Sequence, residues 1–136
     1  MTTFLNTLCA DEIGTFEGRA VHKLLKGLVW QKSPGFQIII PEGFETDLAS
    51  VPRVPIVFML WGDRAHREAV LHDYLYRTDA IPLLEKEDAD WMFREAMIGQ
   101  GCSWFTYQPM YLAVRAAGGS SFHRMKVMDR FNLESP

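Results

Sequence analysis

Residues 72–76, His-Asp-Tyr-Leu-Tyr, bring a histidine, a carboxylate and a phenol together within two turns of a predicted helix. A histidine titrates near neutral pH and can take a proton from water when a buried carboxylate fixes its tautomer. Asp90 lies at the border of the apolar stripe of a second predicted helix, residues 85–99, and is placed to do this. The pattern therefore predicts a hydrolytic site with His72 as general base and Asp90 as its orienting group.

The same two side chains have a structural interpretation. Single histidine and aspartate residues at helix–helix contacts often form a hydrogen-bonded brace and do no chemistry. Asp73, the neighbour of His72, could supply a hard oxygen ligand to calcium if loop carbonyls completed the shell. It points about 100° away from His72 around the helix axis, so the two side chains can flank one cavity but cannot converge on one atom. The sequence leaves the catalytic and the structural interpretations open.

Residues 45–55 read as an ordered loop, because two prolines three residues apart exclude a helix. Short polar side chains hold such loops by bonding to nearby backbone. Here these side chains are Thr46, Asp47 and Ser50. In the structural interpretation they belong to an internal polar network in which Asp47 pairs with Arg53 or Arg115.

Two predicted helices follow this loop and carry the candidate site. The first spans residues 63–77, with Asp63 as its N-cap. Alanines on the same face as His72 leave room for another group to approach the imidazole. The second helix spans residues 85–99 and ends at glycines.

A third predicted helix begins with Thr106 as its N-cap and has Pro109 in its first turn. Residues 110–117 are apolar on every side apart from Arg115. Such a helix is expected to be buried, and a charge in a buried helix needs a partner. The candidate partners of this arginine are Asp47, Asp73 and Asp90.

The first third of the chain is rich in strand formers and predicts a small antiparallel sheet of three or four strands. Residues 20–31 form a segment of this kind that is broken at Gly27. Residues 36–40, Phe-Gln-Ile-Ile-Ile, form a short strand that we expect to be covered on both faces. Residues 11–14 read as a turn.

Residues 118–121, Gly-Gly-Ser-Ser, read as a flexible joint. Beyond the joint, an apolar residue recurs at every third position of residues 122–131, with basic side chains between. This amphipathic segment is either a final helix folded back on the domain or a docking arm for another chain. We therefore expect a single α+β domain over residues 1–118, with a small N-terminal antiparallel sheet packed against three C-terminal helices, and a C-terminal amphipathic arm over residues 119–136.

The 136 residues are enough for one domain with a core and too few for two. A formal net charge of −3 gives no general attraction to nucleic acid, so none is expected as a partner. We expect no transmembrane segment, because no apolar run approaches the ~18 residues of a membrane span. We expect no signal peptide, because the N-terminus lacks a basic start and a long apolar segment. Cys9 and Cys102 stand outside any CxxC pattern and are expected to be free thiols.

Four blocks in the order PEGFETDLASVPR, HDYLY, ADWMFREAM and MYLAVR resemble a family of small phage- and prophage-encoded proteins catalogued as a domain of unknown function. The family pattern runs VPxGFxTDxASxPR, HDxLY, ADxxF and MYxAVR, and the resemblance covers residues 20–118. Ile40 stands where the family usually has valine before the proline. The resemblance implies a phage context and brings no activity with it.

Two of these blocks, HDYLY and DWMF, are also similar to the HDxxY and DxxF arrangement of secreted calcium-dependent phospholipases. This similarity implies that His72 activates water, Asp73 binds calcium and Asp90 orients the histidine, with Tyr76 supporting the site. Residues 46–50 would stand in for the calcium loop of those enzymes. Calcium is accordingly the cofactor to test for.

The expected function is that of a phage protein associated with the virion or the tail. Its His72–Asp90 site is then a candidate hydrolase that acts on an ester or amide of the host envelope. The alternative is a purely structural tail or assembly component in which these two residues belong to a buried hydrogen-bond network. Other virion proteins or further copies of this chain are the expected partners, and the virion or the host cytoplasm is the expected location.

Overall fold

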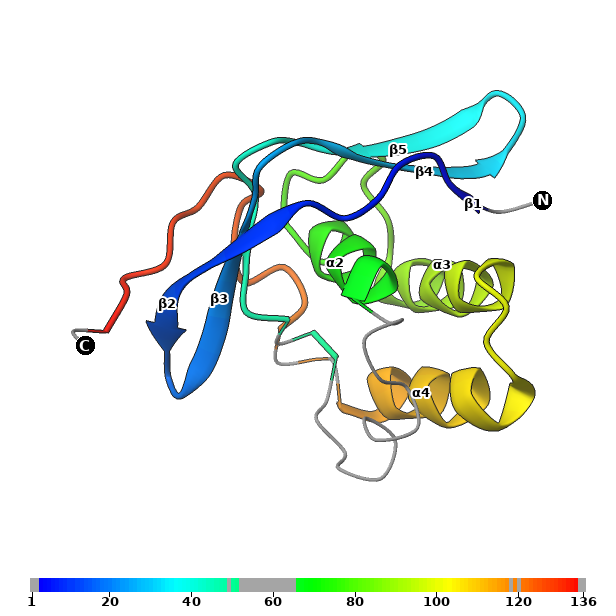
Figure 1. The fold of residues 1–136 in the computed structure, drawn as a ribbon. Helices are drawn as coiled ribbons and strands as arrows, with labels where there is room; N and C mark the ends of the chain where they lie inside the picture. The colour runs from blue at the N-terminus through cyan, green and yellow to red at the C-terminus, as the bar shows by residue number, and fades with distance from the viewer. Residues whose placement is uncertain (1–2, 49, 52–65, 118, 120, 135–136) are drawn as a thin grey trace.

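The computed structural model of this chain describes residues 3–48, 50–51, 66–117, 119 and 121–134 (Figure 1). Within these ranges six strands come first and three helices follow, which confirms the predicted α+β class. Cys9 and Cys102 do not form a disulfide bond. Within the described residues, no helix is long enough and apolar enough to cross a membrane.

The first sheet has three antiparallel strands in the order β1 (Thr3–Phe4), β4 (Leu28–Ser33) and β5 (Phe36–Ile40). Trp30 lies opposite Ile38 in the register, and both side chains are buried. Ile39, which stands between the buried Ile38 and Ile40 on β5, points to the other face and is 59% exposed. The expectation that residues 36–40 are covered on both faces is therefore wrong, because this antiparallel sheet has one face on the core and one in water.

The second sheet has the order β2 (Ala10–Phe16), β3 (Arg19–Leu24) and β6 (Glu45–Thr46), again antiparallel. Glu17 and Gly18 both have positive φ and form the tight turn of the β2–β3 hairpin. The register shifts between Glu12 and Gly14. Residues 11–14 were expected to form a turn, and that expectation is wrong. The glycine there marks a bulge within β2.

The structure has two sheets, where the sequence predicted one. The predicted break at Gly27 is confirmed, and it lies where the chain leaves β3 and enters β4. A side chain at Gly27 would approach the backbone oxygen of Ile40 to 3.3 Å, so the close passage of the chain favours glycine here. The two hairpins extend in different directions from this point (Figure 1).

The three described helices are α2 (His66–Leu75), α3 (Lys86–Gly99) and α4 (Trp104–Ala117). The bounds of α3 confirm the prediction, with Glu85 at the N-cap. The predicted N-cap of the first helix, Asp63, lies outside the described residues. The third helix begins before Thr106, so Pro109 lies inside it and not in its first turn.

The expectation that α4 is buried on every side is wrong. Only Met110 and Val114 among its residues are buried, and they pack against α3. Phe105 is 76% exposed and Leu112 is 55% exposed. The helix lies at the edge of the molecule, beyond α3 (Figure 1). Among the described helices and strands, α4 therefore packs on α3, and the side chains on its opposite face are exposed.

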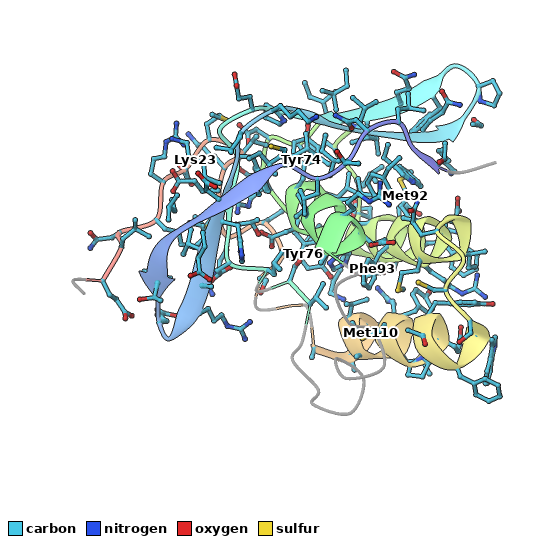
Figure 2. All side chains as sticks on the ribbon, in the orientation of Figure 1. Lys23, Tyr74, Tyr76, Met92, Phe93 and Met110 are labelled. Carbon is cyan, nitrogen blue, oxygen red and sulfur yellow. The ribbon has the colours of Figure 1, made fainter. Side chains whose placement is uncertain are left out.

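The α2 helix lies at the centre of the fold, and every residue from 68 to 77 is buried. The larger apolar cluster joins α2 to both sheets and includes Trp30, Phe44 and Leu71. A smaller cluster lies between α3 and α4, where Phe93 and Met110 face each other (Figure 2). A helix covered on all sides must satisfy its polar side chains internally, and α2 carries both His72 and Asp73.

Residues 121–134 contain turns and irregular structure and no helix, so the expected final helix is wrong. Apolar residues spaced by three drift around a helix and do not form a stable stripe on it. The segment nevertheless folds back on the domain. The backbone N–H of His123 donates to the oxygen of Tyr76 at 2.7 Å, and that of Thr78 donates to the oxygen of Met125 at 2.8 Å. Val127 is 7% exposed and belongs to the larger apolar cluster.

This packing predicts that the C-terminal segment contributes to stability. Val127→Ala should lower the free energy of unfolding by about 1–2 kcal/mol, since it removes two buried methyl groups. Met128→Ala, at a neighbouring position that is 45% exposed, should change it by less than ~0.5 kcal/mol. Urea unfolding followed by circular dichroism measures both. Equal effects of the two substitutions would contradict the packed position of Val127.

Candidate functional site

The carboxylate of Asp90 lies where the three described helices meet, and it is fully buried. Its Oδ1 atom is 2.6 Å from Nε2 of His72 and accepts a hydrogen bond from the Tyr76 hydroxyl at 2.5 Å. Its Oδ2 atom accepts from Nζ of Lys86 at 2.9 Å and from Nη1 of Arg115 at 3.0 Å. We call these five residues the Asp90 network. Side chains from α2, α3 and α4 thus converge on one acid.

Helical spacing explains how the sequence assembles the Asp90 network. Tyr76 directly follows the end of α2, four residues after His72, and its backbone N–H still donates to the oxygen of His72. Lys86 and Asp90 are four residues apart on α3, so the members of each pair lie on the same side. Nζ of Lys86 also donates to the backbone oxygen of Val114 at 2.9 Å. An ammonium group at the carbonyl end of α4 is favourable for the helix dipole.

The charges around Asp90 keep it ionised. Burial alone would raise the pKa of the Asp90 carboxyl. The hydrogen bond and charge of His72, with the bonds from Lys86 and Tyr76, outweigh burial and hold this pKa well below its ordinary value. An ionised carboxylate can only accept hydrogen bonds, so Nε2 of His72 carries a proton in this contact.

The same surroundings fix Tyr76 as a hydrogen-bond donor. Burial raises the pKa of the Tyr76 hydroxyl, and the bond to Asp90 and its negative charge raise it further. The phenol therefore stays protonated at any physiological pH and cannot serve as a base. The hydrogen bond to Asp90 likewise raises the pKa of Arg115.

The second nitrogen of the imidazole contacts the loop after β6. Nδ1 of His72 lies 3.0 Å from Oγ of Ser50, so serine, histidine and aspartate form one hydrogen-bonded chain. In the neutral ring Nδ1 is the acceptor, and the Ser50 hydroxyl donates to it. Chains of this composition activate a serine in acyl-transfer enzymes. Here all three side chains are 0% exposed.

Asp73 faces away from the Asp90 network, although it follows His72 directly. Its Oδ2 atom accepts hydrogen bonds from the Thr46 hydroxyl and, at 3.2 Å, from Nη2 of Arg77. The same arginine donates to the backbone oxygens of Glu45 at 2.8 Å and Lys126 at 2.9 Å. This second network joins α2 to β6 and to the C-terminal segment.

These contacts do not fit the calcium ligand suggested by the phospholipase similarity. A guanidinium group that bonds to Asp73 repels a cation and occupies the oxygen that a metal would need. In the part of the chain that the structure describes, no three His, Cys, Asp or Glu side chains are grouped so as to hold a metal ion. Asp73 has the role of an ion-pair partner of Arg77.

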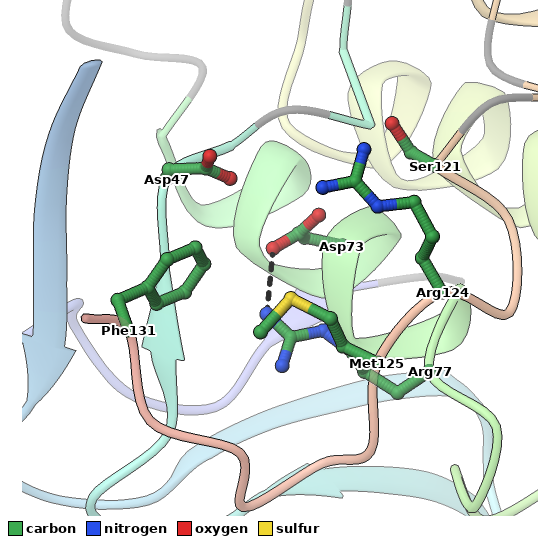
Figure 3. Close-up of a pocket in the computed structure, with 7 residues that line it drawn as sticks. All are labelled: Asp47, Asp73, Arg77, Ser121, Arg124, Met125 and Phe131. Carbon is green, nitrogen blue, oxygen red and sulfur yellow. Dashed lines mark hydrogen bonds and ion pairs between the residues drawn. The ribbon is translucent and has the colours of Figure 1, made fainter. Parts of the chain in front are cut away.

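A small cavity lies beside the second network (Figure 3). It is lined by Asp47, Asp73, Arg77, Ser121, Arg124, Met125 and Phe131. Its volume of about 20 Å³ is room for a single water molecule. Neither His72 nor Asp90 lines it, so this cavity does not give a substrate access to the imidazole.

The structure brings together most of the residues expected in a site. Those in the Asp90 network or bonded to it are His72, Asp90, Tyr76, Arg115 and Ser50. Of the three candidate partners of Arg115, Asp90 is shown to bind it. Thr46 and Asp73 belong to the second network, and Asp47 lines the small cavity. Arg53 lies outside the described residues.

Sequence reasoning missed two members of these networks, Lys86 and Arg77. Each pairs with an aspartate four residues away in the sequence, Lys86 within α3 and Arg77 just past the end of α2, and this spacing was the signal that could have found them. Glu45 was also missed. It is 5% exposed and pairs with Arg130 at 2.9 Å, and its position in the sequence gives no sign of burial.

Comparison with known proteins gives one match. A family model described as a protein of unknown function (DUF1353) matches residues 22–114, about two thirds of the chain. No curated protein and no solved structure matches. The matched region contains four of the five residues of the Asp90 network. The fifth, Arg115, is the first residue after the matched region.

The Asp90 network predicts a strong effect of removing its charge. Asp90→Asn keeps the size of the side chain but leaves Lys86 and Arg115 without their acid, and should cost about 3–5 kcal/mol of unfolding free energy at neutral pH. Because the folded-state pKa of Asp90 is depressed below its ordinary value of 3.8, its contribution is present above that pH and is lost as the pH falls below it. The wild type should therefore lose more stability on acidification than the variant.

Urea unfolding curves at neutral pH and at about pH 3 measure this difference. Asp88→Asn, an exposed acid in the first turn of the same helix, is the matched control and should behave like the wild type. If Asp90→Asn and Asp88→Asn show the same stability and the same acid slope, the Asp90 network does not hold the helices together.

Proposed function

Since the chain belongs to the DUF1353 family of proteins of unknown function, we propose that it is a phage-encoded structural protein of the virion or tail. In this proposal the Asp90 network is a brace that holds the helices in place and does no chemistry. Complete burial is the observation that carries the structural role. Ser50, His72 and Asp90 are all 0% exposed.

The phage context is supported by the four sequence blocks that resemble phage- and prophage-encoded proteins. They include residues 41–53, 72–76 and 89–97. These blocks share a structural role, because each contributes side chains that belong to one of the two networks or are bonded to it. Thr46 and Ser50 come from the first block, His72 and Tyr76 from the second, and Asp90 from the third.

The structural role is further supported by the saturation of the Asp90 carboxylate. Each oxygen has two partners, so neither is left to bind a substrate or a water molecule. A catalytic acid–base pair must exchange protons with a reacting group, which needs a path to that group. A buried acid whose four partners include a side chain from each of three helices instead fixes the relative positions of those helices.

A second candidate function is hydrolysis of an ester or amide of the host envelope. The observation in its favour is the Ser50–His72–Asp90 chain, with contacts of 3.0 Å and 2.6 Å. In that case Ser50 is the nucleophile and His72 takes its proton while Asp90 stabilises the charged ring. A substrate carbonyl would have to reach the buried hydroxyl of Ser50.

Association with the particle can be tested directly. Phage particles from an induced host strain that carries this gene should contain the chain after purification on a density gradient, as detected by mass spectrometry. Particles made with His72→Ala should contain less of it, since the brace is lost. Its absence from wild-type particles, with normal amounts in the lysate, would overturn the structural role in the virion.

Two substitutions separate the brace from the hydrolase. In a brace, Ser50→Ala should cost about 1 kcal/mol of unfolding free energy and His72→Ala about 2–4 kcal/mol, and the wild type should not cleave phospholipid or peptidoglycan. In a hydrolase, the wild type cleaves one of these, and Ser50→Ala abolishes turnover without unfolding the chain. Ser33→Ala, at an exposed serine of β4, is the control for both readouts.

A further inference from the structure

One face of α4 exposes an apolar stripe that no other element among the described residues covers. Phe105, Pro109, Leu112 and Ala116 are all exposed, and their spacing of four, three and four residues places them along one line of the helix. We call them the α4 stripe. Phe105 is 76% exposed and Leu112 is 55% exposed, which is unusual for side chains of this size.

Further apolar side chains are exposed on α3 and at the start of α4. Trp91 and Ile98 of α3 are 44% and 42% exposed, and Trp104 at the start of α4 is 57% exposed. Tyr111 joins the two helices at the surface, because its ring packs edge-on against Trp91 at 5.7 Å. Arg94 lies over the same tryptophan ring at 4.6 Å. Tryptophan, tyrosine and arginine are the residues that dominate protein–protein interfaces.

The charge of α4 restricts the partner. Arg115 is the only charged residue in this helix, and it is bound to Asp90. An acidic or basic partner would find no complementary charge along the stripe. Helices that lie on anionic membranes carry several lysines or arginines on their polar face, and α4 has no lysine. The partner that suits this surface is another uncharged apolar helix face.

We propose that the α4 stripe is the dimer interface of this protein and that a second copy of the chain covers it. The two α4 helices run antiparallel about a two-fold axis between Pro109 and Leu112. In an antiparallel pair, residues at equal distances on opposite sides of the axis face each other. Phe105 therefore lies against Ala116 of the second copy, and Leu112 lies against its Pro109. Each larger side chain thus meets a smaller one, and this permits close packing of two helices.

The area of the patch is sufficient for this dimer. Large apolar side chains each present about 150–250 Å² of surface, so the exposed fractions of Trp91, Ile98, Trp104, Phe105 and Leu112 amount to roughly 500 Å² on each copy. Two copies therefore contribute roughly 1,000 Å² of apolar surface, which reaches the lower limit of specific interfaces before any polar rim is counted. The proposal is independent of whether the Asp90 network is a brace or a catalytic site.

Sedimentation velocity of the full chain over a concentration range of about 1–100 μM tests the dimer. The wild type should be dimeric at the upper end of this range. Leu112→Glu places a charge at the centre of the stripe and should make the chain monomeric, with an unchanged circular dichroism spectrum. Ile39→Glu introduces the same charge at a position of similar exposure on β5 and should leave the dimer intact.

Phe105→Lys is a second disruptive variant for the case in which Leu112→Glu does not fold. It should also make the chain monomeric. A wild type that is monomeric throughout the range overturns the proposal. A folded stripe variant that remains as dimeric as the wild type also overturns it.

Disulfide cross-linking tests the antiparallel arrangement. Phe105→Cys and Ala116→Cys are made separately in a background with Cys9→Ser and Cys102→Ser. A mixture of the two should form a covalent heterodimer on mild oxidation, because the substituted positions face each other across the interface. Each variant alone should cross-link poorly. Efficient cross-linking of each variant with itself, and not in the mixture, would show a parallel pair and overturn the arrangement proposed.

Discussion

The buried carboxylate of Asp90 is the constraint on which the arrangement of the helices depends. A charge removed from water is costly unless several partners compensate it, and partial compensation leaves most of the cost in place. Four donors meet at this one acid, at distances between 2.5 and 3.0 Å, one from each described helix and one from Tyr76 just past the end of α2. Any shift of α4 relative to α2 would break at least one of these contacts. The hydrogen bond that Ser50 donates to His72 extends the same constraint to the loop after β6.

The adjacent residues His72 and Asp73 of α2 contribute to two different interfaces. Successive side chains of a helix diverge by about 100°, so a histidine that faces α3 is followed by an aspartate that faces β6. His72 thus belongs to the packing of helix on helix, and Asp73 with Arg77 to the packing of helix on sheet and C-terminal segment. A helix buried from residue 68 to its end at Leu75 needs polar partners on both sides. Because Asp73 is bound by Thr46 and Arg77, the two adjacent side chains serve separate networks.

Local and helical features of this chain could be predicted from sequence. The bounds of α3, the contact between His72 and Asp90 and the binding of Arg115 to Asp90 all follow from 3.6-residue periodicity and the cost of a buried charge. Three features could not be predicted, because they depend on which segments meet. The division into two sheets depends on how the chain passes Gly27. The bulge in β2 resembles a turn in its composition, and the exposure of Ile39 depends on which face of β5 the core covers.

The error over α4 has a different origin from the others. Its composition predicts burial on every side, yet within one copy only Met110 and Val114 are buried. Sequence patterns report the environment in which a side chain is stable, and this environment includes surfaces of other chains. A helix whose inner face packs on α3 and whose outer face is equally apolar fits an assembled state better than an isolated one. Because Arg115 is held by Asp90, the only charge of α4 is drawn toward the inner side. The network that fixes the helix thus also leaves its outer stripe uncharged and available for a second helix.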